Sequence, residues 1–229
     1  MTDLDKLIKS KIFFFKGTRH DCKNLFDTYT YISKEVHGEN SGILNLKKAN
    51  EPIAYDSKLE KSILEDLDNC VFVKRIKTQS LAVSYKSKIG NKIKTYIPDI
   101  QLLLVDNSIV IIEVKPFREM VNSKVLRKHK ALRKYCKENG FGFAIIGEKY
   151  YSFEDLKKET VDNEIQEAFI NYVNEHDFVT FSDCSDFKKK YKINEKQICN
   201  IIWKNKKRLK YQQFKIKYIN GTTQKNNSK

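Results

Sequence analysis

Residues 96–116 read YIPDIQLLLVDNSIVIIEVKP and hold two apolar runs, 100–105 and 108–114, joined by Asp106 and Asn107. Apolar runs of this length on either side of turn-forming residues predict the two strands of one hairpin, buried within a sheet. The rest of the predicted fold is arranged around this hairpin.

Three charged residues interrupt the apolar pattern: Asp99, Glu113 and Lys115. Side chains alternate between the two faces of a strand, so Glu113 and Lys115 are expected to project from the same face. Pairing around the turn brings Asp99 back toward them. Two carboxylates and an ammonium are costly to bury unless they are paired or bound to a cation, so this group predicts a metal site.

The group suits phosphodiester hydrolysis, because carboxylate oxygens hold Mg2+ and a lysine can steer or deprotonate the attacking water. The pattern resembles the PD-(D/E)xK nuclease superfamily: Pro98 and Asp99, thirteen intervening residues, then Glu113, Val114 and Lys115. The alternative interpretation is an ordinary solvated Glu113–Lys115 pair at a strand edge.

A helix is predicted from Ser57 to about Leu67. Ser57 followed by Glu60 matches the capping-box pattern, and the apolar residues Leu59, Ile63 and Leu67 then cover one face. Glu60 has two interpretations of equal weight. It is either a helix-capping side chain or an acid that reaches the metal cluster from the first core helix, as in many nucleases of this superfamily.

The elements around this centre follow a regular order. Strands are predicted at 71–75, 81–85, 93–105 and 141–146, with a hairpin turn at Ile89 to Asn91 and a helix over about 119–137. Pro98 cannot donate to a sheet ladder and predicts a bend in the strand that carries Asp99. The order resembles the α/β core of restriction endonucleases, a mixed sheet flanked by helices.

The predicted helix after Pro116 is basic. Leu126 and Leu132 are expected to pack on the sheet, while Lys124, Arg127 and Lys128 are available for phosphate contacts. For any one of these three cations, a solvated surface position is the simpler interpretation.

The last third of the chain predicts a small helical unit. Residues 152–177 form one or two acidic helices, 182–191 a short helix, Asn194 to about Arg208 a second one, and 211–219 a strand. This order resembles a winged helix, with a DNA-binding cluster late in the second helix: Lys204, Lys206, Lys207 and Arg208. The alternative is a basic helical bundle that binds a protein. Residues 220–229 are predicted to be disordered.

Composition supports a polyanionic partner. The chain carries 44 Lys and Arg against 29 Asp and Glu, a formal net charge of +15. Its five cysteines are widely spaced without zinc-ligand patterns, which predicts reduced thiols in a cytoplasmic protein. No apolar run approaches the length of a membrane span, so no membrane association is expected.

With these elements placed, the chain resembles TnsA-type endonucleases, the subunits of heteromeric transposases that cut one strand at each transposon end. The matching pieces are residues 55–60, 96–99 and 112–116. The resemblance implies a catalytic set of Glu60, Asp99 and Lys115. Glu113 is a further acid where some members have Gln. Asp99, Glu113 and Glu60 are the implied ligands of Mg2+, with Mn2+ as a substitute.

The family also implies double-stranded DNA as substrate, cut at the 5' ends of the element. Its implied partners are an integrase-type transposase and a regulatory ATPase, in a bacterial, phage or mobile-element setting. The expected divisions are an N-terminal extension (1–50), a nuclease core (51–150), an acidic connector (151–180), a winged-helix-like domain (181–219) and a tail (220–229). The alternatives are a stand-alone restriction, repair or junction-resolving nuclease and a catalytically silent DNA-binding adaptor.

Overall fold

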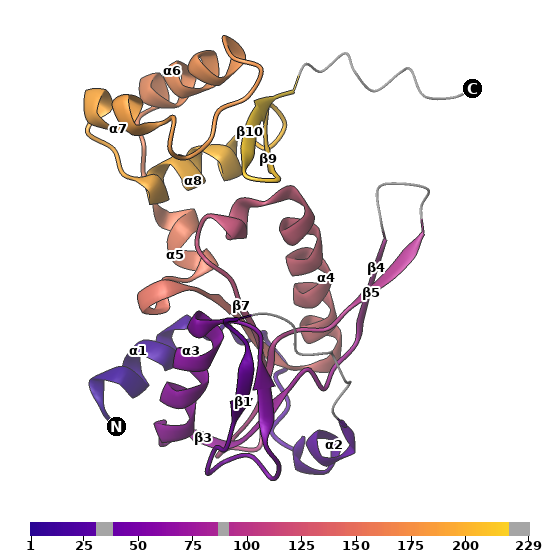
Figure 1. Cartoon of the computed structure of the whole chain (residues 1–229). Helices are drawn as coiled ribbons and strands as arrows, with labels where there is room; N and C mark the ends of the chain where they lie inside the picture. The colour runs from indigo at the N-terminus through magenta and orange to yellow at the C-terminus, as the bar shows by residue number, and fades with distance from the viewer. Residues whose placement is uncertain (31–38, 87–91, 220–229) are drawn as a thin grey trace. The chain divides into compact units, whose positions relative to one another are not determined.

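The computed structural model describes residues 1–30, 39–86 and 92–219 (Figure 1). The turn predicted at Ile89 to Asn91 and the tail at 220–229 lie outside the described residues. The chain divides into two compact units: Met1–Pro116 with Arg127–Ser152, and Phe117–Leu126 with Phe153–Lys229. Among the described residues, no helix combines the length and apolar character needed to cross a membrane.

A four-stranded mixed sheet forms the centre of the first unit. Its strands are β3 (Val73–Thr78), β6 (Ile100–Leu104), β7 (Ile109–Val114) and β8 (Gly142–Ile146), in the order β3-β6-β7-β8. The first two pairings are antiparallel and β7 pairs with β8 in parallel. The predicted hairpin is confirmed as β6 and β7. The mixed sheet with its helices is compatible with the expected nuclease core.

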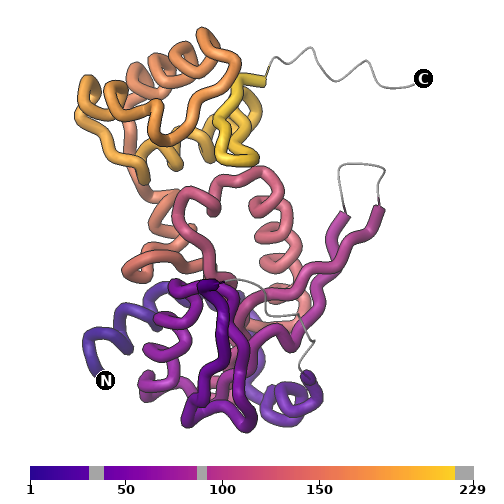
Figure 2. The backbone as a smooth tube through the Cα atoms, in the orientation of Figure 1, coloured from indigo at the N-terminus to yellow at the C-terminus, as the bar shows by residue number. Residues whose placement is uncertain are grey.

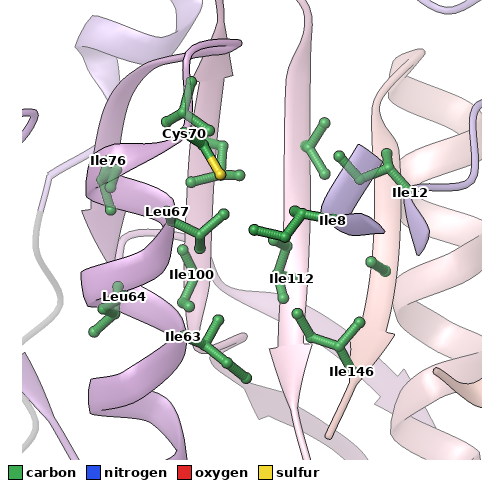
Figure 3. Packing of buried hydrophobic residues seen from close by; sticks show 14 of the residues in the cluster. Ile8, Ile12, Ile63, Leu64, Leu67, Cys70, Ile76, Ile100, Ile112 and Ile146 are labelled. Carbon is green, nitrogen blue, oxygen red and sulfur yellow. The ribbon is translucent and has the colours of Figure 1, made fainter. Parts of the chain in front are cut away.

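Helices α1 (Asp3–Lys11) and α3 (Lys58–Asn69) contribute to the core on one face of the sheet (Figure 3). The apolar residues of α3 recur at helical spacing, so they form one buried stripe. The cluster joins Ile8 of α1 and Ile63, Leu64 and Leu67 of α3 to Ile100, Ile112 and Ile146 of the sheet. Each such side chain contributes about 1.5–3 kcal/mol when fully buried.

Helix α4 (Ser123–Asn139) contributes to the opposite face, where the Arg133 guanidinium lies 5.3 Å from the Phe143 ring. Leu132 is fully buried as predicted, whereas Leu126 is only half-buried. The single helix predicted over 119–137 is interrupted. A short 3-10 turn, η1 (Glu119–Val121), precedes α4, because Asn122 takes a non-helical ψ of 128° between them.

The strand predicted over 81–85 is shifted, and the strand predicted over 93–105 is divided into two. Strand 81–85 is observed as β4 (Val83–Lys86), and the strand predicted over 93–105 is β5 (Ile93–Tyr96) followed by β6. The division falls at Pro98, which has no N–H for a ladder. As a result, β4 and β5 leave the main sheet and form a two-stranded antiparallel ribbon of their own (Figure 2).

The remaining elements of the first unit are short. They are α2 (Lys23–Thr28), β1 (Gly42–Leu44), β2 (Ile53–Tyr55) and the 3-10 turn η2 (Glu148–Tyr150). The N-terminal residues are joined to the edge of the sheet, since the backbones of Phe13 and Phe143 exchange hydrogen bonds of 2.9 and 3.0 Å.

The second unit contains four helices and a hairpin within its described residues: α5 (Phe153–Lys158), α6 (Asn163–Asn174), α7 (Ser185–Tyr191), α8 (Glu195–Lys204), β9 (Leu209–Gln212) and β10 (Lys215–Tyr218). The predicted cap at Asn194 is confirmed by a complete capping box. Two predictions were wrong. Helix α8 ends at Lys204 rather than Arg208, and the strand 211–219 is a hairpin because Gln213 and Phe214 take φ of 52° and 61° in a tight turn.

Candidate active site

The position of Asp99 follows from the register of the central hairpin. Ile100 lies opposite Ile112, so Asp99 comes opposite Glu113 just beyond the last paired residue. Pro98 has no N–H with which to extend the ladder, and the side chain of Asp99 bonds to the neighbouring strand instead. Its Oδ2 accepts a 2.7 Å hydrogen bond from the backbone N–H of Val114. The bend predicted at Pro98 therefore turns a carboxylate toward the end of β7.

Lys115 joins the two carboxylates. Its Nζ lies 3.2 Å from Asp99 Oδ2 and 3.0 Å from Glu113 Oε1, and it donates to the carbonyl oxygen of Val114 at 2.8 Å. These three contacts occupy the three donors of the ammonium. Asp99 and Glu113 are only 8% and 2% exposed. The convergence of Asp99, Glu113 and Lys115 predicted from the sequence is thus present in the structure.

The pKa values in this cluster depart from their ordinary range. Burial alone lowers the pKa of Lys115, but the Asp99 and Glu113 carboxylates outweigh burial and raise the pKa above its usual value. Burial raises the pKa of Glu113, and the neighbouring charge of Asp99 raises it further. Lys115 is therefore a stable cation at neutral pH, better suited to stabilising negative charge than to removing a proton.

Glu60 lies in the first turn of α3 and lines the same cavity as Asp99 and Glu113. The Ser57 hydroxyl caps α3 by accepting from the Glu60 N–H at 3.1 Å. The Glu60 carboxylate does not complete a capping box with Ser57. Its Oε2 accepts instead from the Asp56 N–H at 3.0 Å. Burial, followed by the charge of Asp99, raises the pKa of Glu60 to about 7, so this acid lies within electrostatic reach of the cluster.

The four predicted catalytic residues line one cavity of about 310 Å3. Asp56, Ile97 and Lys128 are also among its lining residues. A larger cavity of about 790 Å3 lies beside Arg75 and Lys77. Those two cations are already bonded, Arg75 to Asp27 and Lys77 to the carbonyl oxygen of Phe26, so the smaller cavity holds the reactive groups.

Lys128 and Tyr96 are site residues that sequence reasoning did not place in the cavity region. Lys128 was predicted only as a surface phosphate contact, yet its ammonium lies 5.0 Å from the centre of the Tyr96 ring and lines the cavity. For Tyr96, the sequence signal of a place near the site is its position three residues before Asp99. The neighbouring His129 is buried, and burial lowers its pKa to about 3, so it is neutral at physiological pH.

The other predicted DNA contacts differ in exposure. Lys124 is exposed and Arg127 is half-buried. In the second unit, Lys204, Lys206 and Lys207 are exposed, but the last two lie in the turn after α8 rather than on the helix. Arg208 forms a bidentate pair with Glu167, at 2.6 and 2.9 Å, and is engaged within the unit.

The donor set suits a hard divalent cation such as Mg2+. Two buried carboxylate oxygens, Glu60 Oε1 and Glu113 Oε2, have no hydrogen-bond partner among the described residues. Oxygen atoms of this kind are the preferred ligands of Mg2+. In the part of the chain that the structure describes, no three acidic, His or Cys side chains converge closely enough to form a ready-made metal centre. Asp99 and Glu113 converge instead on the Lys115 ammonium.

The geometry of the site agrees with the comparison to known families. Residues 72–148 match the family model described as TnsA-like endonuclease N terminal. No curated protein matches the chain. The matched segment contains Asp99, Glu113, Lys115 and Lys128, whereas Glu60 precedes it. The resemblance to TnsA-type endonucleases is therefore confirmed over residues 72–148.

Proposed function

We propose that this protein is a metal-dependent DNA endonuclease and a subunit of a heteromeric transposase. It cuts one DNA strand, at the 5' ends of the transposon. The observation that carries the proposal is the buried cluster of Asp99, Glu113 and Lys115 inside the segment that matches the TnsA-like family. Buried charges of this kind are often no more stabilising than apolar residues of similar volume, so their presence favours a functional role.

Asp99, Glu113 and Glu60 are the residues proposed to hold Mg2+ or Mn2+, and the unpartnered oxygens of Glu60 and Glu113 support this assignment. The bound ion would supply Lewis-acid stabilisation of the phosphate and a more acidic water. Lys115 remains charged beside Asp99 and Glu113, so it is placed to stabilise negative charge that develops on phosphorus.

The second unit supports a winged-helix-like role in DNA binding. Helix α6 is followed by a strand-like bridge between Val179 and Ile216, then by helices α7 and α8 and the β9–β10 hairpin. This order of helices followed by a wing is typical of winged-helix domains. The exposed Lys204, Lys206 and Lys207 supply positive charge at the end of α8.

Partner proteins form part of the same proposal. An enzyme that cuts one strand of the element needs a second activity for the other strand. We therefore include an integrase-type transposase and a regulatory ATPase, as the resemblance to TnsA-type endonucleases implies. The double-stranded DNA of the transposon end is the proposed substrate.

The test is nicking of a supercoiled plasmid that carries candidate element ends, in Mg2+ and in Mn2+. Wild-type protein is compared with Lys115→Ala and with Lys137→Ala, a matched loss of an exposed lysine from α4. We expect cutting by wild type and Lys137→Ala in the presence of the transposase partner, and none by Lys115→Ala. Equal cutting by Lys115→Ala contradicts the assigned site. Full cutting without any partner contradicts the transposase context and indicates a stand-alone nuclease.

A further inference from the structure

The β4–β5 ribbon is a feature of the first unit that the proposed active site does not use. It is paired as Val83 with Tyr96, Ser84 with Thr95, Tyr85 with Lys94 and Lys86 with Ile93. In the figures the ribbon projects from the unit as a separate arm (Figures 1 and 2). Val83 and Tyr96 are buried at its base, whereas most other described residues of the ribbon are exposed, so the outer part of the arm contributes little to the core.

The charge of the ribbon has one sign. Lys86, Lys92 and Lys94 are all exposed. The sequence contains no Asp or Glu between Cys70 and Asp99. None of these three lysines forms an ion pair with a described residue. They therefore present uncompensated positive charge to a partner.

The two faces of the ribbon differ. Directly paired residues share a face, so Tyr85, Lys94 and Tyr96 project to one side. The Tyr85 and Tyr96 rings confirm this, with centroids 6.2 Å apart in an edge contact. The opposite face carries Lys86 and the exposed Ile93.

The face of Tyr85 and Lys94 leads to the active site. Tyr96 is buried at the base of the ribbon, and the ammonium of Lys128 lies 5.0 Å from its ring. Lys128 in turn lines the cavity that holds Asp99 and Glu113. Lys94, Tyr85, Tyr96 and Lys128 therefore form a continuous row of cationic and aromatic side chains that ends at the reactive carboxylates.

We propose that the β4–β5 ribbon is an arm that holds duplex DNA beside the scissile phosphate, through the face that bears Lys94 and Tyr85. This inference rests on the proposed nuclease function and adds the surface on which the substrate lies. Lysine ammonium and tyrosine hydroxyl groups are donors to backbone phosphates, and an antiparallel two-stranded ribbon is narrow enough to follow a groove of DNA. The contacts are to the sugar-phosphate backbone and position the strand without reading its sequence.

A different role for the same lysines is to keep the exposed edges of the ribbon from pairing with other chains. That role requires charge on the ribbon but does not distinguish its faces. Lys94 and Lys86 lie on opposite faces of one hairpin and are both exposed, so they form a matched pair of positions. Comparing them separates a DNA contact from general repulsion.

The first experiment measures binding of a fluorescein-labelled duplex, in EDTA so that no cleavage occurs, to full-length wild type, Lys94→Gln and Lys86→Gln. One lost phosphate contact lowers the slope of log K against log salt by about 0.9, which corresponds to about fivefold weaker binding at about 0.15 M salt. We expect this change for Lys94→Gln and less than about twofold for Lys86→Gln. Equal effects at the two positions overturn the inference while leaving the nuclease proposal intact. Absence of any salt-dependent binding by wild type overturns both.

The second experiment reports contact directly. All five native cysteines are buried, so a cysteine introduced at an exposed ribbon position is the preferred target of a thiol-reactive dye. Lys94→Cys and Lys86→Cys are labelled with an environment-sensitive fluorophore and titrated with the same duplex. We expect DNA to change the emission at position 94 and to leave position 86 nearly unchanged. No change at position 94, or the same change at both, refutes the assigned face.

Discussion

Replacing Glu60 by Gln is expected to stabilise the metal-free protein at alkaline pH while impairing cleavage. Glu60 is only 4% exposed, one of its oxygens has no partner among the described residues, and burial raises its pKa from 4.5 to about 7. The folded state therefore binds the Glu60 proton more tightly than the unfolded state. The stability associated with this proton is fully present below about pH 4.5 and is lost as the pH rises through about 7.

The size of the effect follows from the shift. A shift of about 2.5 units, at about 1.4 kcal/mol per unit, makes the ionised Glu60 unfavourable by about 3 kcal/mol at pH values well above 7. Gln keeps an oxygen for the Asp56 N–H and has no charge, but its amide N–H2 lacks a partner, which costs about 1 kcal/mol. We expect Glu60→Gln to unfold with a free energy about 2 kcal/mol higher than wild type at about pH 8, and nearly equal at about pH 5.

The assay is urea denaturation in EDTA, followed by far-UV circular dichroism. Tryptophan fluorescence is unsuitable, because the single tryptophan, Trp203, lies in the second unit. The matched control is Glu65→Gln, an exposed acid on the same helix, which should change stability by less than about 0.5 kcal/mol at either pH. Addition of Mg2+ should stabilise wild type more than Glu60→Gln. A variant that is less stable than wild type at pH 8, or a difference that does not vary with pH, refutes the reasoning about Glu60.

Three further outcomes are expected. Lys115→Met leaves the Asp99 and Glu113 carboxylates buried without their cation, so the unfolding free energy should fall by about 3 kcal/mol near neutral pH. The loss should be smaller in acid, where Glu113, whose pKa is raised by burial, is protonated, and an equal loss at both pH values contradicts this. Leu67→Ala removes a fully buried side chain of α3 and should lower the free energy of unfolding by about 2–5 kcal/mol in the same denaturation assay. A decrease below about 1 kcal/mol contradicts this expectation. Asn194→Ala removes the capping box of α8 and should destabilise the second unit by about 1 kcal/mol. The unfolding transition followed by Trp203 fluorescence should then occur at a lower urea concentration, and an unshifted transition would show that the cap does not limit the stability of this unit.

The central hairpin and its charged residues could be predicted because their signals are local. The apolar runs, the Asp106 turn and the alternation of Glu113 with Lys115 all depend on neighbours along one hairpin, and β6 and β7 confirm them. The apolar stripe on α3 could likewise be predicted from its helical spacing, and its residues are buried or half-buried against the core as expected. Local periodicity determines these elements because burial of both faces of the sheet leaves little freedom in register.

The errors arose where a tertiary contact or a turn competes with local pattern. Residues 93–105 look like one continuous strand, but Pro98 interrupts the ladder and the Asp99 side chain takes the Val114 N–H. Residues 211–219 are equally strand-like, and only the left-handed conformations of Gln213 and Phe214 reveal the reversal. Neither is Gly or Asn, the residues that usually mark such a turn, so the sequence offers no clear signal there.

The placement of Lys128 could not be predicted for a different reason. A basic helix shows which positions are cationic, but not which of them faces a cavity, because this depends on how α4 packs on the sheet. In the structure Lys128 lies over Tyr96, and Arg133 lies over Phe143. Lys128 was expected only as a general phosphate contact, and the sequence did not indicate its position over an aromatic ring beside the cavity. Aromatic residues near a basic helix are therefore a signal that some of its cations pack on rings.

The composition of the cluster itself argues for a function rather than for stability. Asp99, Glu113 and Glu60 contribute three carboxylates and Lys115 one ammonium to the same cavity. A structural ion pair would be balanced, whereas this group has an excess of negative charge when its acids are ionised, and burial raises the pKa of both glutamates in response. Apolar residues of similar volume are often as stabilising as buried ionic groups or more so. Under the proposed function, one bound divalent ion would offset this excess of negative charge.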